Sequence, residues 1–578
     1  MKNYGLRFTS FIVFLLFFGC QQSPKQLVDI ILDISQETFN PLLEPDTTGF
    51  ISVVGIYSDG TNKIINDGEI KLSAKTKIVS GNVEVIKIEG NKLIPNEGGV
   101  ATIQAVVIKD GKTFREEKDV VVRPFYRDYH QILVLKLFMG MDGERVKPRK
   151  RDLVFNRDGD PSRICTFAEA LEVIKKTDNL TCGIPKIIYL VGWQKGGHDH
   201  LYPAWNIVNP KLKREEDSTA LESLRWLIRE AQQYHTTVSL HINMVDCFKD
   251  SPLWDEYVRR DIVSRDVNGE LLPAWEAIKN HQCYHLSYTR EWAEGLTQKR
   301  IDGLIEMIPE LKDGHTIHVD VFIAKWVPDH HRPLSPWHAK PENGGIDMYR
   351  EVETQRKIFK YWRDKGFDVT GEGILWAHPP GEGFYGLQPM AWWYPSGIEH
   401  QMRIPERLTA RGRTSRGNQG DYRFSSSMHG EEIYLQDKET LPGFLDMFCN
   451  TTLPWYYLSQ HERISFTNEV LYYSEGIKAG EEDGVKIIRK GDYVLRENNN
   501  LFVEAKWKEK EIIAYSENGY KDKYWQLPDS WEDVKRINIY RITMKGKELI
   551  EASKDIESGK LKLSLNKGEA VSIIPLGK

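Results

Sequence analysis

The sequence has little cysteine and no strong excess of either charge. Its 578 residues include 6 cysteines, and no two of them form a CxxC pair. This spacing argues against a disulfide framework and a thiolate zinc site, and it predicts scattered, mostly buried thiols. The formal net charge of −5 gives no reason to expect a nucleic-acid partner. A neutral, sugar-like ligand suits the 16 tryptophans and 25 tyrosines better.

A long apolar run is also lacking, since residues 11–18 ("FIVFLLFF") are too few for a good transmembrane span. Lys2 and Arg7 precede this run, and Gly19 and Cys20 follow it. The pattern predicts a bacterial lipoprotein signal over residues 1–20, with Cys20 lipidated as the first residue of the mature chain. We therefore expect a lipid-anchored protein at the cell surface or in the periplasm. An ordinary cleaved signal with a chance cysteine is the alternative.

Two regions of the sequence are predicted to contain only β-strands. Residues 25–125 consist of short alternating segments separated by Gly, Asn and Asp, which predicts a small immunoglobulin-like β-sandwich. Residues 476–578 return to the same rhythm and predict a C-terminal β-sandwich.

The central region, residues 130–475, alternates apolar strand runs with amphipathic helices. The predicted strands are 131–138, 185–193, 236–243, 316–322 and 367–373, and the clearest predicted helices are 219–235 and 345–366. Such βα units predict a parallel sheet, and over this length the favoured form is a (β/α)8 TIM-like barrel. An open doubly wound sheet is the alternative. A nucleotide-binding version of such a sheet is disfavoured, because no GxGxxG motif follows the first strand.

Polar side chains collect where these strand runs end. In a barrel the carboxyl ends of the strands face one pocket, so we expect these groups to converge. They are His198, Asp199, His241, Asn243, Asp320 and Glu372.

Two of these residues, Asp320 and Glu372, are carboxylates on successive strand ends, a pattern typical of glycoside hydrolysis. Asp320 lies inside its strand and suits a fixed nucleophile. Glu372 lies between two glycines and suits a proton donor. The structural alternatives are an ion pair of Asp320 with Lys325 or Arg332, and a solvated loop position for Glu372.

The predicted glycosidase needs no cofactor. A catalytic metal site is an alternative prediction. Its candidate ligands are His198, Asp199, His200, His241, Asp329, His330 and His331. Neither an HxH pair on the first strand nor an HExxH helix is present, so the pattern is not that of a typical zinc hydrolase.

Several motifs in order resemble glycoside hydrolase family 101, the endo-α-N-acetylgalactosaminidases, with family 129 as a related group. The matching segments are "LVGWQKGGHDHLYP", "SLHIN", "HVDVF", "GFDVTGEG" and "GNQGDY". They run from about residue 185 to about residue 425, which is most of the predicted barrel.

The resemblance implies a retaining α-glycosidase acting on α-linked N-acetylgalactosamine in mucin-type O-glycans. Asp320 would be the nucleophile and Glu372 the general acid/base. The implied substrate-binding residues are His198, Asp199, His241, Asn243, Trp275 and Gln419. Pro273 replaces the first tryptophan of a paired W-x-W, which leaves the exact glycan open.

The implied partner is a glycan or glycoprotein, with no nucleic acid and a membrane contact through the lipid anchor alone. A non-catalytic surface glycan-binding lipoprotein is the competing function.

Overall fold

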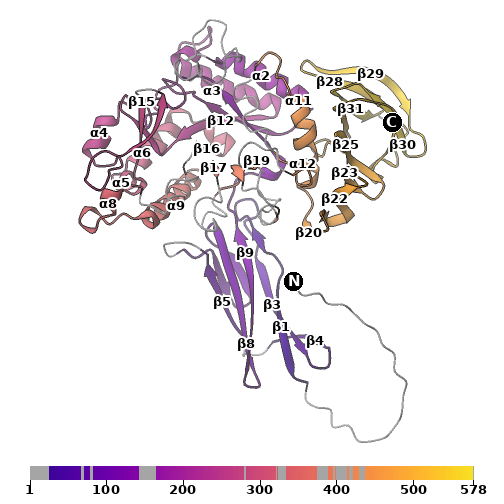
Figure 1. Cartoon of the computed structure of the whole chain (residues 1–578), viewed down its shortest axis with the longest axis horizontal. Helices are drawn as coiled ribbons and strands as arrows, with labels where there is room; N and C mark the ends of the chain where they lie inside the picture. Colours follow the sequence, from indigo (N-terminus) through magenta and orange to yellow (C-terminus); the bar gives the residue numbers. More distant parts are fainter. Residues whose placement is uncertain are drawn as a thin grey trace, which may run out of the picture.

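The computed structural model describes most of the chain. The described residues are 25–66, 70–77, 83–141, 164–278, 281–320, 322, 334–373, 388–394, 398, 402, 413–414, 421–427 and 437–576. They form an N-terminal all-β part, a central α/β part and a C-terminal all-β part (Figure 1). In that view the N-terminal strands extend away from the other two parts, which lie side by side.

The N-terminal part consists of two sheets around one core. One has the strand order β1-β3-β7-β6, with β4 on β3, and the other has the order β2-β9-β8-β5. The strands are β1 (Leu27–Ile34), β2 (Thr38–Phe39), β3 (Gly49–Tyr57), β4 (Asn62–Ile64), β5 (Ile70–Thr76), β6 (Ile86–Glu89), β7 (Lys92–Pro95), β8 (Gly99–Lys109) and β9 (Lys112–Val122). Alternate residues are buried, as in Ala101, Ile103 and Ala105 of β8, and side chains from both sheets share one apolar cluster.

The central part is built on a seven-stranded sheet of the order β10-β11-β12-β16-β17-β18-β19, in which every neighbouring pair is parallel. Its strands are β10 (Leu133–Phe138), β11 (Lys186–Val191), β12 (Thr236–Asn243), β16 (Thr316–Asp320), β17 (Asp368–Gly373), β18 (Ala391–Tyr394) and β19 (Arg413–Thr414). The predicted parallel sheet is confirmed. Its strands follow chain order without the reversal that defines a doubly wound sheet.

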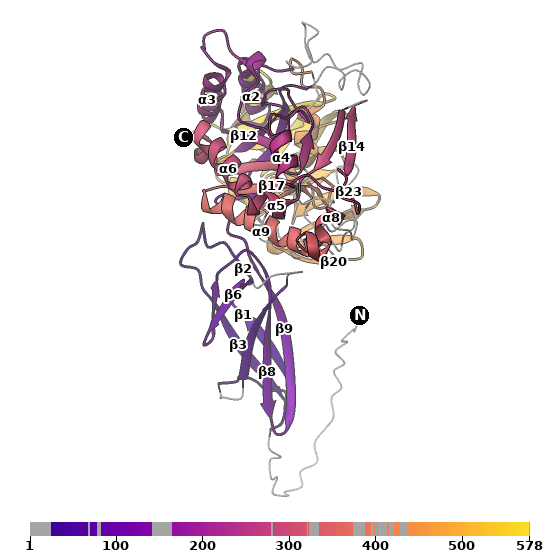
Figure 2. The same cartoon turned by 90° about the vertical axis from the view of Figure 1, so that its left-hand side faces the viewer.

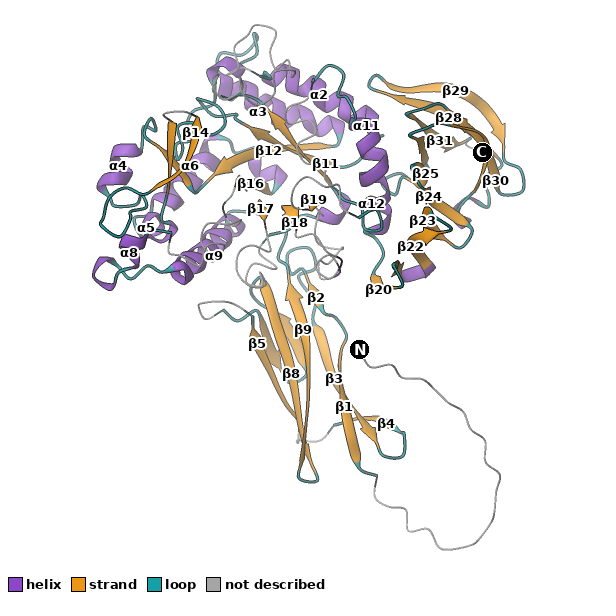
Figure 3. Cartoon of the chain, in the orientation of Figure 1, coloured by secondary structure: helices purple, strands orange, loops and turns teal. Residues whose placement is uncertain are grey.

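Helices connect these strands and cover the sheet (Figure 3). They include α2 (Phe167–Leu180), α3 (Ala220–Ala231), α5 (Tyr288–Ala293), α6 (Leu296–Met307), α7 (Leu311–Gly314), α8 (Pro336–Ala339) and α9 (Met348–Asp364). Thr166 and Thr219 begin α2 and α3 with capping boxes, which satisfy amide groups that the first turn leaves without partners. The two predicted helices at 219–235 and 345–366 are thus present as α3 and α9.

A small antiparallel sheet interrupts the βα pattern between β12 and β16. It pairs β13 (Asp246–Phe248) with β15 (His281–His285), and β15 with β14 (Pro273–Ile278). The short helix α4 (Trp254–Arg259) lies between β13 and β14 in the chain. Figure 2 shows β14 at the right-hand edge of the α/β part. No pattern in the sequence predicted this sheet.

The C-terminal part is a ten-stranded sheet with a separate two-stranded ribbon of β27 and β30. The strands are β20 (Arg463–Thr467), β21 (Val470–Tyr473), β22 (Ile477–Glu482), β23 (Val485–Lys490), β24 (Tyr493–Glu497), β25 (Asn500–Glu504), β26 (Ile512–Ser516), β27 (Tyr520–Gln526), β28 (Arg536–Thr543), β29 (Gly546–Asp555), β30 (Lys560–Leu565) and β31 (Glu569–Pro575). Hydrogen bonds join this part to the end of α2, from Asn179 Nδ2 to the Met544 carbonyl (2.9 Å) and from Trp507 Nε1 to the Cys182 carbonyl (3.1 Å).

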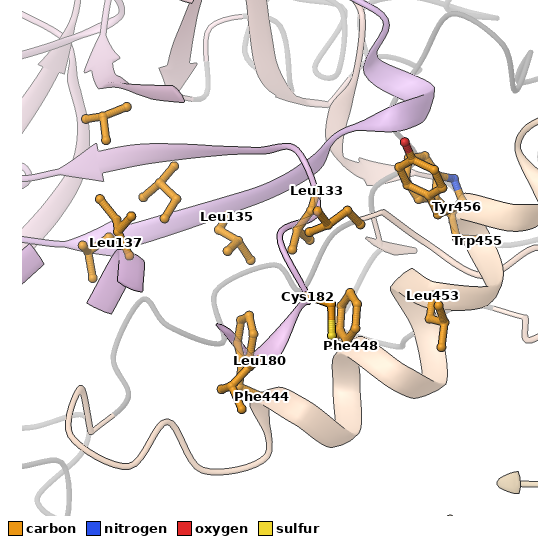
Figure 4. Packing of buried hydrophobic residues seen from close by; sticks show 14 of the residues in the cluster. Leu133, Leu135, Leu137, Leu180, Cys182, Phe444, Phe448, Leu453, Trp455 and Tyr456 are labelled. Carbon is orange, nitrogen blue, oxygen red and sulfur yellow. The ribbon is translucent and has the colours of Figure 1, made fainter. Parts of the chain in front are cut away.

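A helical segment leads into the C-terminal sheet and packs against the first strand of the parallel sheet. It comprises α11 (Phe444–Met447), a π-helical turn at Phe448–Thr452, and α12 (Leu453–Leu458). Its apolar side chains share a core with leucines of β10 (Figure 4).

The chain enters the parallel sheet at the amino ends of its strands. The Tyr126 amide donates to both carboxylate oxygens of Asp368, at 2.9 and 3.0 Å. Arg127 donates to Thr237 Oγ1 and to the Gly314 carbonyl. The N-terminal part therefore contacts the end of the sheet opposite to the predicted site.

The five cysteines of the described residues are all free and buried, as the spacing predicted, and Cys20 lies outside these residues. Among the described residues, no helix combines the length and the apolar character needed to cross a membrane.

Candidate active site

Three neighbouring strands bring polar residues to one level at their carboxyl ends. Asn243 of β12 pairs with Asp320 of β16, and Val319 pairs with Gly371 of β17. The next position of this register places the backbone of Glu372 beside that of Asp320. Neighbouring strands lie about 4.8 Å apart, so the two predicted carboxylates occupy adjacent positions in the sheet.

Asp320 is buried but loosely held. Its Oδ2 lies 3.4 Å from His241 Nε2 and 3.4 Å from Asn243 Nδ2. Both distances exceed the usual range for a strong hydrogen bond. Its Oδ1 makes no hydrogen bond within the described part of the chain. One carboxylate oxygen is therefore available to a ligand.

The loop after β11 brings His198 and Asp199 to the same place. The His198 amide donates to the Gly140 carbonyl (2.9 Å), and the His198 ring meets the His241 ring edge to face, with centroids 5.3 Å apart. His198 Nε2 lies 3.5 Å from Asp199 Oδ2. Gly192 allows this approach, because a Cβ there would lie only 1.9 Å from the Gly140 oxygen. The loop thus closes tightly over the end of β10.

His318, two residues before Asp320, lies deeper in the sheet and is fully buried. Burial lowers its pKa well below the usual value, and the charges of Lys136 and His241 act in the same direction. A neutral imidazole therefore underlies His241, with ring centroids 5.0 Å apart.

Asp246 is a central residue that the sequence analysis missed. Its Oδ2 accepts from Asn243 Nδ2 at 2.8 Å, and its Oδ1 accepts from Trp275 Nε1 at 3.2 Å. The Asp246 amide donates to Asn243 Oδ1 at 2.8 Å, so the two side chains fix one another. The available signal was an Asn-x-x-Asp spacing at a strand end, which is too common to single out.

The electrostatic state of Asp246 differs from that of an ordinary aspartate. Burial raises its pKa to about 8, and the negative charges of Asp199 and Asp320 add to this effect. Asp246 is therefore mostly protonated at neutral pH. A neutral Asp246 spares Asp320 the repulsion of one more anion.

Of the predicted site residues, the structure brings together His198, Asp199, His241, Asn243, Asp320 and, through Asp246, Trp275. The side chain of Glu372 lies outside the described part, as do Gln419, Lys325 and Arg332.

The potential metal ligands divide into two groups. Donor atoms of His198, His241 and Asp320 lie within 4.8 Å of one another, and so do those of His200, Asp250 and His281. The remaining predicted ligands Asp329, His330 and His331 lie outside the described residues.

Residues 157–362 match the family model of the endo-alpha-N-acetylgalactosaminidases. This segment therefore resembles a glycoside hydrolase family 101 domain. The match contains Asp320 and the described residues of the cluster around it, and it ends ten positions before Glu372. The protein is accordingly a glycoside hydrolase, and the non-catalytic glycan-binding alternative is set aside.

Comparison with solved structures finds remote similarity alone. The alpha-N-acetylgalactosaminidase NagBb from Bifidobacterium bifidum, in complex with GalNAc, has a TM-score of 0.42 at 10% identity, over 76% of this chain and 87% of that chain. The alpha-galactosidase from Lactobacillus brevis has a TM-score of 0.39 at 10% identity, over 96% and 86%. These values carry no functional conclusion, and no curated protein matches the chain.

Proposed function

We propose that this glycoside hydrolase is a retaining α-glycosidase that cleaves α-linked N-acetylgalactosamine from mucin-type O-glycans. The observation that supports the mechanism is the register of the parallel strands, in which Asn243 pairs with Asp320 and Val319 pairs with Gly371, the residue before Glu372. A retaining pair needs carboxyl groups about 5 to 5.5 Å apart, which neighbouring strand ends provide. The family match supports the sugar.

In the first step, Oδ1 of Asp320 attacks the anomeric carbon while protonated Glu372 gives its proton to the leaving oxygen. The bond to that oxygen breaks, and a glycosyl ester with Asp320 forms. In the second step, Glu372 removes a proton from water, which attacks the same carbon and releases Asp320. The net anomeric configuration is retained.

The neighbouring residues take positioning roles in this proposal. His241 and Asn243 hold Oδ2 of Asp320, which leaves Oδ1 directed at the sugar. Asp199, beside His198, would bind sugar hydroxyls, and the predicted role of Gln419 is to contact the same sugar. Trp275, fixed through its indole N–H by Asp246, offers a flat face to the ring.

The test uses the full chain with aryl α-glycosides of N-acetylgalactosamine and of Gal-β1,3-N-acetylgalactosamine. We expect release of the aglycone, and proton NMR of the first product should show the α-anomer. The relative rates on the two substrates identify the preferred glycan. A β-anomer as first product would refute the two-step mechanism, and no release from either substrate would refute the proposed substrate class.

A second candidate function is favoured by the group of His198, His241 and Asp320, whose donor atoms lie within 4.8 Å of one another. Two imidazoles and a carboxylate are a typical ligand set for catalytic zinc. In a metal-dependent hydrolase, Asp320→Asn would lose bound metal together with activity. In the retaining glycosidase the same variant loses activity alone.

We also propose that the parallel sheet continues into a closed (β/α)8 barrel over residues 130–475. An immunoglobulin-like sandwich would lie at 25–125 and a C-terminal sandwich at 476–578. The packing of α11 and α12 against β10 supports closure, because the last helix of a barrel returns to its first strand. A crystal structure with an eighth strand beside β10 tests this fold.

The predicted lipoprotein signal leads to a proposal on location. Cys20 would be lipidated, and the protein would be anchored to a bacterial membrane. Replacing Cys20 by Ala should move the protein from the membrane fraction to the soluble fraction and abolish labelling with a fatty-acid probe. Unchanged labelling would contradict the proposal.

A further inference from the structure

A second histidine–aspartate group lies beside the candidate active site. His200 follows Asp199 in the loop after β11, Asp250 lies two residues beyond β13, and His281 begins β15. One donor atom from each of the three side chains lies within 4.8 Å of the other two. The group therefore joins three segments that are separate in the sequence.

The contacts within this group are already close to those of a metal site. His200 Nδ1 lies 3.1 Å from Asp250 Oδ2. The rings of His200 and His281 have centroids 5.0 Å apart and planes 18° from parallel. In a tetrahedral zinc site the Zn–N distances are near 2 Å. Donor atoms of such a site lie roughly 3.3 Å apart, so the His281 donor would move by no more than about 1.5 Å.

His281 also carries a polar atom that a ligand would satisfy. Its Nε2 is buried and makes no hydrogen bond within the described part of the structure. The ring stacks on Phe248, with centroids 4.5 Å apart and planes 7° from parallel. Phe248 holds the ring in place, while a buried nitrogen without a partner costs free energy. Coordination of a cation would remove that cost.

The loop is shaped around the His200 ring. A Cβ at Gly196 would lie 2.7 Å from His200 Nδ1, so a side chain there would displace the ring. Asp199 and Leu201, on either side of His200, both have positive φ, at 54° and 60°. Residues other than glycine adopt this conformation at a cost, which persists where the surroundings demand it.

We propose that His200, Asp250 and His281 bind one divalent cation of the zinc class. Imidazole nitrogens with a carboxylate oxygen favour zinc and its transition-metal neighbours over calcium and magnesium, which prefer oxygen ligands alone. The ion clamps the loop that carries Asp199 to the small sheet that carries Trp275. It thereby holds the two sides of the sugar pocket together without taking part in the chemistry.

This inference does not rest on the proposed glycosidase activity, because binding is measured on unreacted protein. The full chain is treated with a chelator, dialysed, and titrated with Zn2+ by calorimetry, and its thermal unfolding is recorded with and without Zn2+. We expect one equivalent to bind and the unfolding temperature to rise. Asp250→Asn and His281→Ala should each weaken Zn2+ binding at least tenfold. Asp250 is exposed, so its variant is expected to fold.

The matched control is His235→Ala. His235 also lies against an aspartate, with Nδ1 3.2 Å from Asp178 Oδ1, but it belongs to neither candidate metal group. Its variant should bind Zn2+ as the wild type does. The proposal fails if the wild type does not bind Zn2+, or if Asp250→Asn and His281→Ala bind it as tightly as the wild type. It also fails if binding is lost in Asp320→Asn and kept in Asp250→Asn, because the ion would then occupy the other group.

Discussion

The two ends of the parallel sheet each bury a carboxylate, but they treat it differently. At the amino end, both oxygens of Asp368 accept the Tyr126 amide at ordinary hydrogen-bond distances. At the carboxyl end, Asp320 has two contacts of 3.4 Å to one oxygen and no hydrogen bond to the other within the described residues. A carboxylate held by the backbone supports the fold, whereas one left partly without partners can serve a ligand.

The two ends can also be compared by the pKa values of their buried aspartates, Asp368 and Asp246. Burial raises the pKa of Asp368 to about 8, although the Tyr126 amide hydrogen bond opposes the shift. At the other end burial raises the pKa of Asp246 to about 8 as well. The protonated acid at the carboxyl end is therefore a supporting residue, which relieves the charge near Asp320.

The largest expected effect comes from removing the proposed catalytic carboxylates. Asp320→Ala should reduce kcat by roughly 10⁴-fold or more, as loss of a nucleophile does in other enzymes. Glu372→Ala should reduce it by about 10² to 10⁴-fold, with the smallest loss on substrates with good leaving groups. Steady-state kinetics on aryl glycosides measure both. Wild-type rates in both variants would show that the site is elsewhere.

Asp246→Asn should have the next largest effect. The amide keeps the shape, but it offers one acceptor oxygen where Asn243 and Trp275 need two. Losing a buried hydrogen bond costs about 1 to 3 kcal/mol, so kcat/KM should fall roughly 10- to 100-fold. Because asparagine does not titrate, any change in rate near pH 8 that the wild type owes to Asp246 should be absent from the pH–rate profile of the variant. If kcat/KM and the profile are unchanged, Asp246 is a structural residue like Asp368.

Trp275→Phe should have a smaller effect, confined to binding. Phenylalanine keeps an aromatic face but cannot donate to Asp246 Oδ1. We expect KM to rise about fivefold with kcat nearly unchanged, from the loss of about 1 kcal/mol. A fall in kcat with constant KM would instead give Trp275 a role in the transition state.

Asp368→Asn should leave the kinetics unchanged and alter stability alone. The folded pKa of about 8 lies above the unfolded value, so wild-type stability falls as the pH rises from about 4 to about 8. Asparagine does not titrate, and the amide oxygen still accepts from Tyr126. The unfolding temperature of the variant should therefore decline less between about pH 5 and about pH 8. An equal decline in both proteins would contradict the raised pKa.

The sequence predicted the features that follow from local periodicity. The strands ending at Asn243 and Asp320 are buried along nearly their whole length and end in polar residues, so both the parallel sheet and the cluster of side chains at its carboxyl end could be predicted. The contact between His198 and His241 followed from that topology.

The remaining features depend on contacts between distant segments. Asp246 becomes important through Trp275, which lies 29 residues later and reaches it across the antiparallel sheet of β13, β15 and β14. The partner of Asp368 comes from Tyr126, 242 residues earlier. No local pattern in the sequence indicates either pairing.

The most direct test of the central claim is azide rescue of Glu372→Ala on an aryl α-N-acetylgalactosaminide with a good leaving group. The claim is that Asp320 and Glu372, on neighbouring strands, act as nucleophile and acid/base. Glycosylation of Asp320 then needs little acid help, and azide replaces the water that Glu372 would activate. We predict that azide raises turnover and that the product is the α-glycosyl azide, because azide attacks the β-linked ester of Asp320 with a second inversion. A β-glycosyl azide, or no change on adding azide, would contradict the claim.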